Sequence, residues 1–275
     1  MDSIRPFLLD ILAGIGDAAG MTYPGGKNGA GVYQQIINRM PPHHTYIEAF
    51  VGGGAVMRLK KPARINIGVD LDPEPLKLLA SLLPACGSGI ARNAVATIVW
   101  DESPDVAPFA GFSEGRSRFT LFHGEAVEFL ERYAFAGDGR ELIYCDPPYM
   151  MCSERSGRAI YEHEMSEEAH LRLLRLLRKL PAKILISGYW SALYADELRQ
   201  WKRVTYRGVT RKGSKTEWLW YNFPDPVELH DYRYLGQGFR ERERIKRKTL
   251  RWKKKLEKMP QLERQALLAA MSQTA

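Results

Sequence analysis

Short apolar or β-branched runs alternate with helical patterns along most of the 275-residue chain, and this alternation limits the possible folds more than any other feature. Strands separated by helices are typical of a parallel sheet that carries helices on both faces. The last two runs are joined by a short Gly/Lys/Ser turn, so they should pair as an antiparallel hairpin. The sequence therefore predicts a doubly wound α/β domain. Its strands are expected near residues 45–50, 65–71, 119–122, 141–145, 183–187, 203–207 and 217–223.

The clearest helical pattern lies between Ser166 and Leu180. Ser166 can cap the first turn, and Glu167 and Glu168 complement the positive end of the helix dipole. Leucines repeat at helical spacing, and Pro181 follows the last turn. We predict a scaffold helix here.

Composition divides the chain into a core and its attachments. The stretch 84–118 is rich in Gly, Ser, Pro and Ala, and only 95–100 is strand-like, so we interpret it as a short insertion. Beyond residue 223 two prolines mark a second change, and a short helix is expected at 262–271 after Pro260. The units are an N-terminal extension (1–20), a core domain (21–83 and 119–223), the insertion (84–118) and a C-terminal appendage (224–275).

All of the excess positive charge lies in one segment of the appendage. The segment that begins at Arg240 and ends at Lys255 carries ten basic and two acidic residues, and its net charge of +8 equals that of the whole chain. A helix would place four apolar residues on one stripe: Ile245, Trp252, Leu256 and Met259. Such a helix can dock on the body and present positive charge to nucleic-acid phosphates. The alternative is a solvated basic tail without a defined role.

The sequence argues against a membrane protein, a secreted protein and a metal-binding protein. No apolar run approaches the roughly 20 residues of a membrane helix. The N-terminal segment lacks a convincing secretion-signal cleavage pattern, so we expect a cytoplasmic protein with no membrane partner. The histidines His43, His44 and His170 lack partners at metal-ligand spacing, and no metal site is expected.

The sequence Asp146-Pro147-Pro148-Tyr149 follows a predicted strand and should therefore lie at its carboxyl end, where α/β sheets bind ligands. An exocyclic amine such as N6 of adenine is a poor nucleophile, because its lone pair is delocalised into the ring. A carboxylate from Asp146 and the carbonyl of Pro147 can each accept one N–H and favour a pyramidal nitrogen. Two prolines stiffen the loop, and Tyr149 offers a flat face to an extruded base. The alternative is an ordinary proline turn.

A glycine loop follows the first predicted strand, in the sequence Phe50-Val51-Gly52-Gly53-Gly54. Glycines at Gly52 and Gly54 permit a tight turn and a close approach of backbone to a nucleotide-like ligand. Asp70 ends the next strand and can accept hydrogen bonds from ribose hydroxyls, with Asp72 as the second candidate. A dinucleotide would fit this loop equally well, but the Asp146 motif favours S-adenosyl-L-methionine.

Two further segments add candidate ligand contacts. The sequence YPGGK ends at Lys27 and begins at Tyr23, which offers an aromatic face. The cation of Lys27 can bind the methionine carboxylate of the cofactor or nearby polar groups; the alternative is a turn with a solvated lysine. Glu125, after the third strand, can accept from the cofactor's adenine amine; the alternative is a helix-capping acid.

Together these residues resemble the motifs of the Dam-type, alpha-group N6-adenine-specific DNA methyltransferases. The match runs in the family's order: 23–27 resembles its N-terminal cofactor motif, 50–54 its glycine motif, Asp70 its ribose-binding acid and 146–149 its catalytic motif. Segments 186–189 and 216–222 are similar to the family's later strand motifs, so the resemblance spans 23–223.

The resemblance implies a Rossmann-like methyltransferase sheet, with direct transfer of a methyl group from S-adenosyl-L-methionine to N6 of a flipped-out adenine in DNA. It also implies a monomer or weak dimer, and it implies contacts to both cofactor and base at Asp146. The candidate catalytic residues are Asp146, Pro147 and Tyr149. The candidate cofactor contacts are Tyr23, Lys27, Phe50, Gly52, Gly54, Asp70, Glu125 and Asp146.

One departure from the family concerns target recognition. The family carries its recognition domain between the ribose acid and the catalytic motif, where this chain has only the short insertion 84–118, with few basic residues. We therefore expect a short or relaxed target sequence, with much of the DNA affinity supplied by residues 240–255 through phosphate contacts. An RNA N6-adenine methyltransferase remains an alternative, as does a catalytically silent nucleic-acid-binding protein. An N4-cytosine enzyme fits less well, since that group more often has serine first in the motif.

Overall fold

In the part of the chain that the structure describes, eight strands form one sheet, in the order β3-β4-β2-β1-β5-β6-β8-β7. The computed structural model describes residues 27, 29, 31–83, 95–99, 117–150, 165–210 and 213–273. The elements in chain order are α2 (Val32–Ile37), β1 (Thr45–Ala49), α3 (Ala55–Leu59), β2 (Ile65–Asp70), α4 (Pro73–Leu82), β3 (Val95–Val99), β4 (Arg118–His123), α5 (Ala126–Arg132), β5 (Glu141–Cys145), α6 (Glu167–Leu177), β6 (Lys183–Gly188), α7 (Ala192–Glu197), β7 (Lys202–Thr210), β8 (Gly213–Tyr221), α8 (Phe239–Lys258) and α9 (Gln261–Ser272).

The strand directions confirm the predicted α/β, Rossmann-like fold. Strands β1 to β6 pair in parallel, whereas β8 is antiparallel to β6 and forms an antiparallel hairpin with β7. All seven predicted strands are present. From β1 the chain proceeds to β2 and β4 on one side, and later to β5 and β6 on the other. The order therefore reverses between β1 and β5, the point at which open α/β sheets bind ligands.

Residues 95–99 of the predicted insertion join the sheet as its edge strand, β3. They pair in parallel with β4, with Thr97 opposite Thr120. The rest of the insertion, 84–94 and 100–116, lies outside the described residues. The insertion therefore extends the sheet beyond the strand that follows it in the chain.

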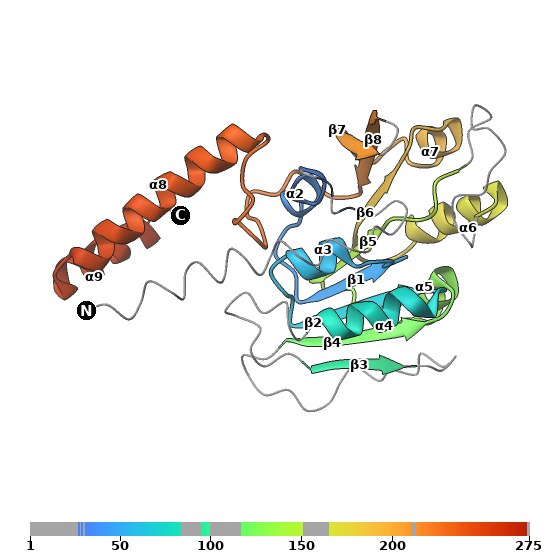
Figure 1. Cartoon of the computed structure of the whole chain (residues 1–275), viewed down its shortest axis with the longest axis horizontal. Coiled ribbons are helices and arrows are strands. Elements are labelled where there is room, and N and C mark those ends of the chain that lie inside the picture. The colour runs from blue at the N-terminus through green and yellow to red at the C-terminus, as the bar shows by residue number, and fades with distance from the viewer. Residues whose placement is uncertain are drawn as a thin grey trace.

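Helices cover both faces of the sheet (Figure 1). Alternate residues of β1 point to opposite faces, so Tyr46 packs in one apolar cluster and Ile47 in the other. The first cluster includes residues of α2, α3 and α4, and the second includes residues of α5, α6 and α7. Strands β1 and β5 are buried along their whole length, as expected for central strands. Covering both faces leaves the carboxyl ends of the strands as the place for a ligand.

The predicted scaffold helix is α6. Its N-cap is Ser166, whose hydroxyl oxygen accepts a hydrogen bond from the backbone N–H of Ala169 at 3.2 Å. Leu173, Leu174 and Leu177 form its buried face. This face packs in the same apolar cluster as Ile143 and Cys145 of β5, the strand that precedes Asp146.

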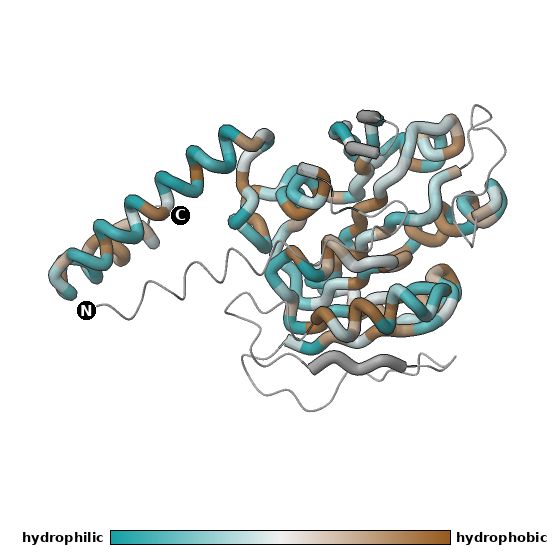
Figure 2. The backbone as a smooth tube through the Cα atoms, in the orientation of Figure 1, coloured by the Kyte–Doolittle hydropathy of each residue, from teal (hydrophilic) through white to brown (hydrophobic). Residues whose placement is uncertain are grey.

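The appendage contains both predicted helices, but it departs from the sequence prediction in one respect. The expected docking of α8 on the body is wrong: α8 has no buried residue, and Trp252 of its apolar stripe is 50% exposed. Figure 1 shows α8 extending away from the sheet, and Figure 2 shows it to be hydrophilic along most of its length. A 20-residue helix is about 30 Å long, and basic residues occupy most of its surface, so few apolar side chains are left to bind the body.

Side chains of α2 hold the chain just before α8. The Asn38 side-chain amide donates to the carbonyl oxygen of Gly236 at 3.1 Å, and the Gln35 amide donates to that of Gln237 at 2.7 Å. The root of the projecting helix is thus attached to the domain. Among the described helices, none is both long enough and apolar enough to cross a lipid bilayer.

Candidate active site

The glycine loop and the Asp146 motif start side by side at the reversal point of the sheet. Ala49 at the end of β1 is paired with Cys145 at the end of β5, and the Asp146 N–H lies 3.5 Å from the Ala49 carbonyl oxygen. Two motifs that are almost a hundred residues apart in sequence therefore lie side by side at the carboxyl ends of β1 and β5. Their positions agree with the sequence prediction for both.

The loop after β1 turns through left-handed backbone conformations. Phe50 has φ of 63°, and it is the only non-glycine residue with positive φ in the described part of the chain. Gly52 and Gly54 have φ of 46° and 58°. A non-glycine residue in this conformation is strained, and such strain is concentrated at ligand sites. The loop is thus shaped by glycines at the positions that the sequence analysis selected.

Asp70 joins this loop to the end of β2. Its Oδ2 accepts from the Gly52 N–H at 2.6 Å, and its Oδ1 accepts from the Asp72 N–H at 2.9 Å. Asp72 instead caps α4, since its side chain accepts from the Glu74 N–H at 2.9 Å. Of the two candidate ribose acceptors, Asp70 is therefore the one that contacts the glycine loop.

Glu125 lies after β4 as the N-cap of α5. Its Oε2 accepts from the Glu128 N–H at 2.7 Å. The structure thus shows the helix-capping role that was the alternative interpretation of Glu125. The cap uses one of the two carboxylate oxygens. Tyr23, the other outlying candidate, lies outside the described residues.

Lys27 lies at the Asp146 motif rather than in solvent. Its Nζ is 2.9 Å from Asp146 Oδ1 and 3.2 Å from Glu217 Oε2, and it donates to the Tyr149 hydroxyl. The lysine side chain is only 5% exposed. The three protons of its ammonium group are thus matched by three oxygen acceptors. The alternative interpretation of the sequence, a turn with a solvated lysine, is wrong.

Asp146 is held through one of its two oxygens. Oδ1 accepts from Ser187 Oγ at 2.7 Å and from Lys27, and Ser187 Oγ shares a second hydrogen bond with the Tyr144 hydroxyl at 2.9 Å. Within the described ranges, no donor contacts Oδ2. The carboxylate is therefore oriented by its neighbours while one oxygen stays available as an acceptor.

Glu217 is a site residue that the sequence analysis did not select. It belongs to β8, where the pairing of Trp218 with Gly188 puts Glu217 just beyond the carboxyl end of β6. Its Oε2 accepts from the Tyr149 hydroxyl at 3.0 Å and the Tyr206 hydroxyl at 3.1 Å. The segment 216–222 carried a motif signal, but nothing in it indicated that this glutamate faces Asp146.

The Tyr149 hydroxyl has one proton to donate and lies within hydrogen-bond distance of two carboxylates. Its hydroxyl lies 3.0 Å from Glu217 Oε2 and 3.3 Å from Asp146 Oδ1. Because the shorter contact is the stronger hydrogen bond, Tyr149 donates to Glu217 and accepts from Lys27. The position of the Tyr149 ring thus depends on Glu217 as well as on its own loop.

Burial and charge act in opposite directions on the ionisable groups. Burial raises the pKa of Asp146, Lys27 acts to lower it, and the negative charge of Glu217 adds to the increase. Burial acts to lower the pKa of Lys27, but the two carboxylates outweigh burial and hold it above its ordinary value. Burial also raises the pKa values of Tyr149 and Tyr206 well above the ordinary range, so both phenols stay neutral donors.

Further aromatic side chains lie beside Tyr149. The rings of Tyr149 and Tyr189 have centroids 4.5 Å apart, and Lys215 Nζ lies 5.3 Å from the centroid of Tyr189. Trp190, next in the chain, is 56% exposed. These flat faces are suited to stacking with a nucleobase.

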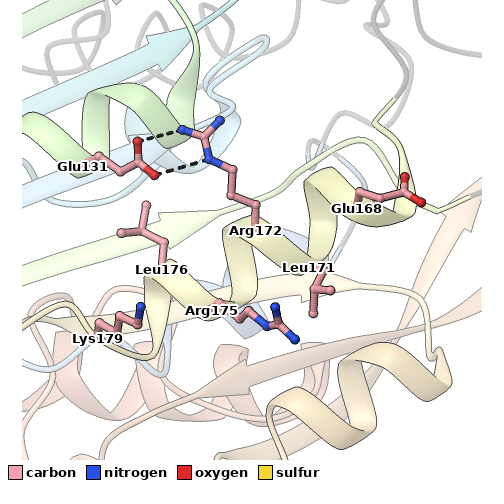
Figure 3. Close-up of a pocket in the computed structure, with 7 residues that line it drawn as sticks. All are labelled: Glu131, Glu168, Leu171, Arg172, Arg175, Leu176 and Lys179. Atoms are coloured by element: carbon pink, nitrogen blue, oxygen red, sulfur yellow. Dashed lines mark hydrogen bonds and ion pairs between the residues drawn. The ribbon is translucent and has the colours of Figure 1, made fainter.

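A separate shallow pocket lies on the outside of the helix layer (Figure 3). Its lining residues come from α5, α6 and the turn after α6: Glu131, Glu168, Leu171, Arg172, Arg175, Leu176 and Lys179. Glu131 and Arg172 form an exposed ion pair across it, with 2.7 Å between Oε2 and Nη2. It contains none of the strand-end residues, and we do not assign the active site to it.

Substitution of Gly54 by alanine is expected to lower the free energy of unfolding. Alanine in the left-handed conformation costs about 1–2 kcal/mol. Its Cβ would also lie 2.7 Å from Leu79 Cδ1 and Cδ2, so overpacking adds about 1–3 kcal/mol. The matched control is Gly139→Ala, where φ is 73° but nothing lies within 4 Å of the added Cβ. Chemical denaturation should give a larger loss for Gly54→Ala, and equal losses would contradict the packing argument.

No protein-family model and no curated protein matches the chain. It is similar to solved structures that include precorrin 8W decarboxylase from Methanobacterium thermoautotrophicum, with 13% identity, 74% of this chain and 96% of that one covered, and a TM-score of 0.42. An rRNA methylase from Streptococcus thermophilus shows 10% identity, 74% and 98% coverage and a TM-score of 0.41. TrmK from M. capricolum, in complex with S-adenosyl-homocysteine, shows 10% identity, 88% and 95% coverage and a TM-score of 0.39. The roles of the site residues therefore depend on the geometry described above.

Proposed function

We propose that the chain transfers a methyl group from S-adenosyl-L-methionine to the N6 amine of adenine in DNA. The observation that supports this most directly is the state of Asp146. Its carboxylate lies at the end of a central strand, with Oδ1 held by Ser187 and Lys27 and with Oδ2 left as an acceptor. A stiff Pro-Pro loop carries the adjacent carbonyl and the Tyr149 ring.

The residues at the reversal point fit S-adenosyl-L-methionine, which supplies an electrophilic methyl group on a sulfonium. The loop with Gly52 and Gly54 would receive the nucleoside, and Asp70, which already contacts this loop, would accept from the ribose hydroxyls. Glu125 remains the proposed acceptor for the adenine amine of the cofactor. Two carboxylates against one ammonium in the neighbouring cluster favour a cationic ligand.

The chemistry at the target amine follows from the two acceptors. Asp146 Oδ2 and the carbonyl of Pro147 each accept one N–H, so the nitrogen lone pair is available for the methyl group. The nitrogen–carbon bond forms as the carbon–sulfur bond breaks, and the nitrogen then gives up one proton. Asp146 is placed to take that proton, and the increase that burial causes in its pKa favours this step.

The substrate is proposed to be DNA because a DNA duplex offers both an adenine that can be extruded and a line of backbone phosphates, and the protein has surfaces suited to each. An adenine must leave the stack to reach Asp146, and the aromatic faces of Tyr149 and Tyr189 can hold it. The basic helix α8 offers positive charge to phosphates. RNA shares these features, so the experiment must separate the two.

Labelled cofactor incubated with duplex DNA, single-stranded DNA and RNA of the same sequence is expected to give incorporation in DNA at N6 of adenine. Incorporation in RNA alone would replace this proposal by the RNA alternative, and no incorporation in any substrate would contradict methyl transfer to nucleic acid. Sequencing of the methylated DNA is expected to show a short or degenerate context, since the insertion is short. A strict site of six base pairs would rule out relaxed specificity.

A further inference from the structure

We propose that Glu217 is a positioning residue of the same site: it holds Lys27 between itself and Asp146 and thereby sets how strongly Asp146 accepts from the target amine. This inference rests on the proposed function. It assigns a role to a residue that lies outside the motif loops and comes from the antiparallel strand β8.

The first support is the sharing of one ammonium group by two carboxylates. Lys27 Nζ is 2.9 Å from Asp146 and 3.2 Å from Glu217. An ammonium bound by Asp146 alone would neutralise that carboxylate and weaken it as an acceptor. Because Glu217 takes part of the interaction, Lys27 can orient Asp146 without neutralising it.

The second support is the convergence of donors on Glu217. Its Oε2 accepts from Lys27, Tyr149 and Tyr206, and the side chain is only 8% exposed. A buried carboxylate is costly unless it is paired and hydrogen-bonded. Three donors on one oxygen satisfy it, and one of them is the ring proposed to stack on the base.

The third support is the space kept for this side chain on the neighbouring strand. Gly208 of β7 faces Glu217, and a Cβ at Gly208 would lie 2.9 Å from Glu217 Cδ. Any larger residue at position 208 would displace the carboxylate from Lys27. The glycine at position 208 thus leaves room for the Glu217 side chain. The variant Gly208→Ala should therefore move the carboxylate without removing it.

The charges near Asp146 define the expected pH dependence. The ionisable groups that influence it or lie beside it are Lys27, Tyr46, Glu48, Tyr144, Cys145, Tyr149, Tyr194, Tyr206 and Glu217. Of these, Lys27 and Glu217 are the charged groups that shift the pKa of Asp146 most, and they act in opposite directions. Loss of the Glu217 charge should lower the pKa of Asp146, whereas loss of the Lys27 charge should raise it.

The first test is the pH profile of kcat/KM for methyl transfer to duplex DNA. Since Asp146 must be ionised to accept, the acid limb should move to lower pH in Glu217→Gln and to higher pH in Lys27→Met. We expect kcat of Glu217→Gln and of Gly208→Ala to fall about tenfold, less than the roughly 10²-fold that a group in direct proton transfer contributes, because Glu217 acts through Lys27. If the acid limb moved in the same direction in both variants, or did not move in either, the inference would be overturned.

The matched control is Glu141→Gln. Glu141 is also a buried glutamate, 4% exposed, but it starts β5 at the opposite end of the sheet and accepts from the Ala136 N–H. Its substitution should leave the acid limb in place. A shift equal to that of Glu217→Gln would show that a general loss of packing moves the limb, and the inference would be wrong.

The second test uses thermal unfolding of the ligand-free protein and does not depend on activity. Lys27→Met leaves two buried carboxylates without their cation, so Tm should fall by about 5–10 °C. Adding Glu217→Gln to that variant should restore at least half of the loss, because the repulsion is removed. Absence of any recovery would overturn the pairing. An inactive wild-type protein would contradict the proposed function alone, since this measurement still tests the pairing.

Discussion

Replacement of Asp146 by alanine is expected to lower methyl transfer to DNA by about 10³-fold or more, a magnitude typical of losing a group that acts on the reacting atoms. In the proposed mechanism the side chain is the acceptor for one N–H of the target amine and the base for the proton released. Both roles need the oxygen that Lys27 and Ser187 leave open. Steady-state rates with labelled cofactor would measure the loss.

Asp146→Asn separates the two contributions of the carboxylate. An asparagine keeps the size of the side chain and one oxygen to accept from Ser187, but it has neither the negative charge nor a basic site. We therefore expect Asp146→Asn to be nearly as inactive as Asp146→Ala. S-adenosylhomocysteine binding, measured by calorimetry, should stay within about tenfold of wild type, the effect of removing one interaction of about 1.4 kcal/mol. Activity that survives Asp146→Ala would sink the catalytic assignment.

Deletion of residues 239–275 is expected to weaken DNA binding by about 10²-fold or more at physiological salt and to flatten its salt dependence. Helix α8 projects from the body, has no buried residue and has a net charge of +8, equal to that of the whole chain. The slope of log K against log salt should fall by about 0.9 for each phosphate that the shortened protein no longer neutralises. The rate at saturating DNA should change little, because α8 contributes no residue to the described site.

A substitution variant tests the same prediction without removing the helix. Four exposed basic residues of α8 would be changed to glutamine: Arg247, Lys248, Arg251 and Lys254. The matched control changes four exposed basic residues on α6 and the turn that follows it: Arg172, Arg175, Arg178 and Lys179. We expect a reduced salt slope for the α8 variant only. Unchanged binding after both the deletion and the α8 substitutions would refute the phosphate-binding role.

Phosphate binding by α8 bears on specificity as well as on affinity. Phosphate contacts hold the protein on a duplex but do not read its bases. A methyltransferase that gains most of its affinity from α8 would therefore methylate many sequences, in agreement with the short insertion. The projecting basic helix would therefore account for the predicted relaxed specificity.

Local sequence patterns determined the elements and where the main motifs lie. All seven predicted strands are present, and α6 starts after its predicted Ser166 cap, although it ends at Leu177 rather than at the predicted Leu180. These features depend on residues a few positions apart, through capping, periodicity and turn chemistry. The place of Asp146 at a strand end and the turn at Gly52 and Gly54 follow from the same local rules.

Only the tertiary structure decided which side chains meet. Glu217 reaches Lys27 because β8 returns antiparallel beside β6, and Ser187 reaches Asp146 because β6 is the neighbour of β5. Strand order and register depend on pairing between distant segments, which no local periodicity encodes. The same reason explains β3 at the sheet edge. For α8 the apolar stripe predicted a docked helix, but the few apolar side chains available to it could not outweigh the solvation of eleven basic side chains.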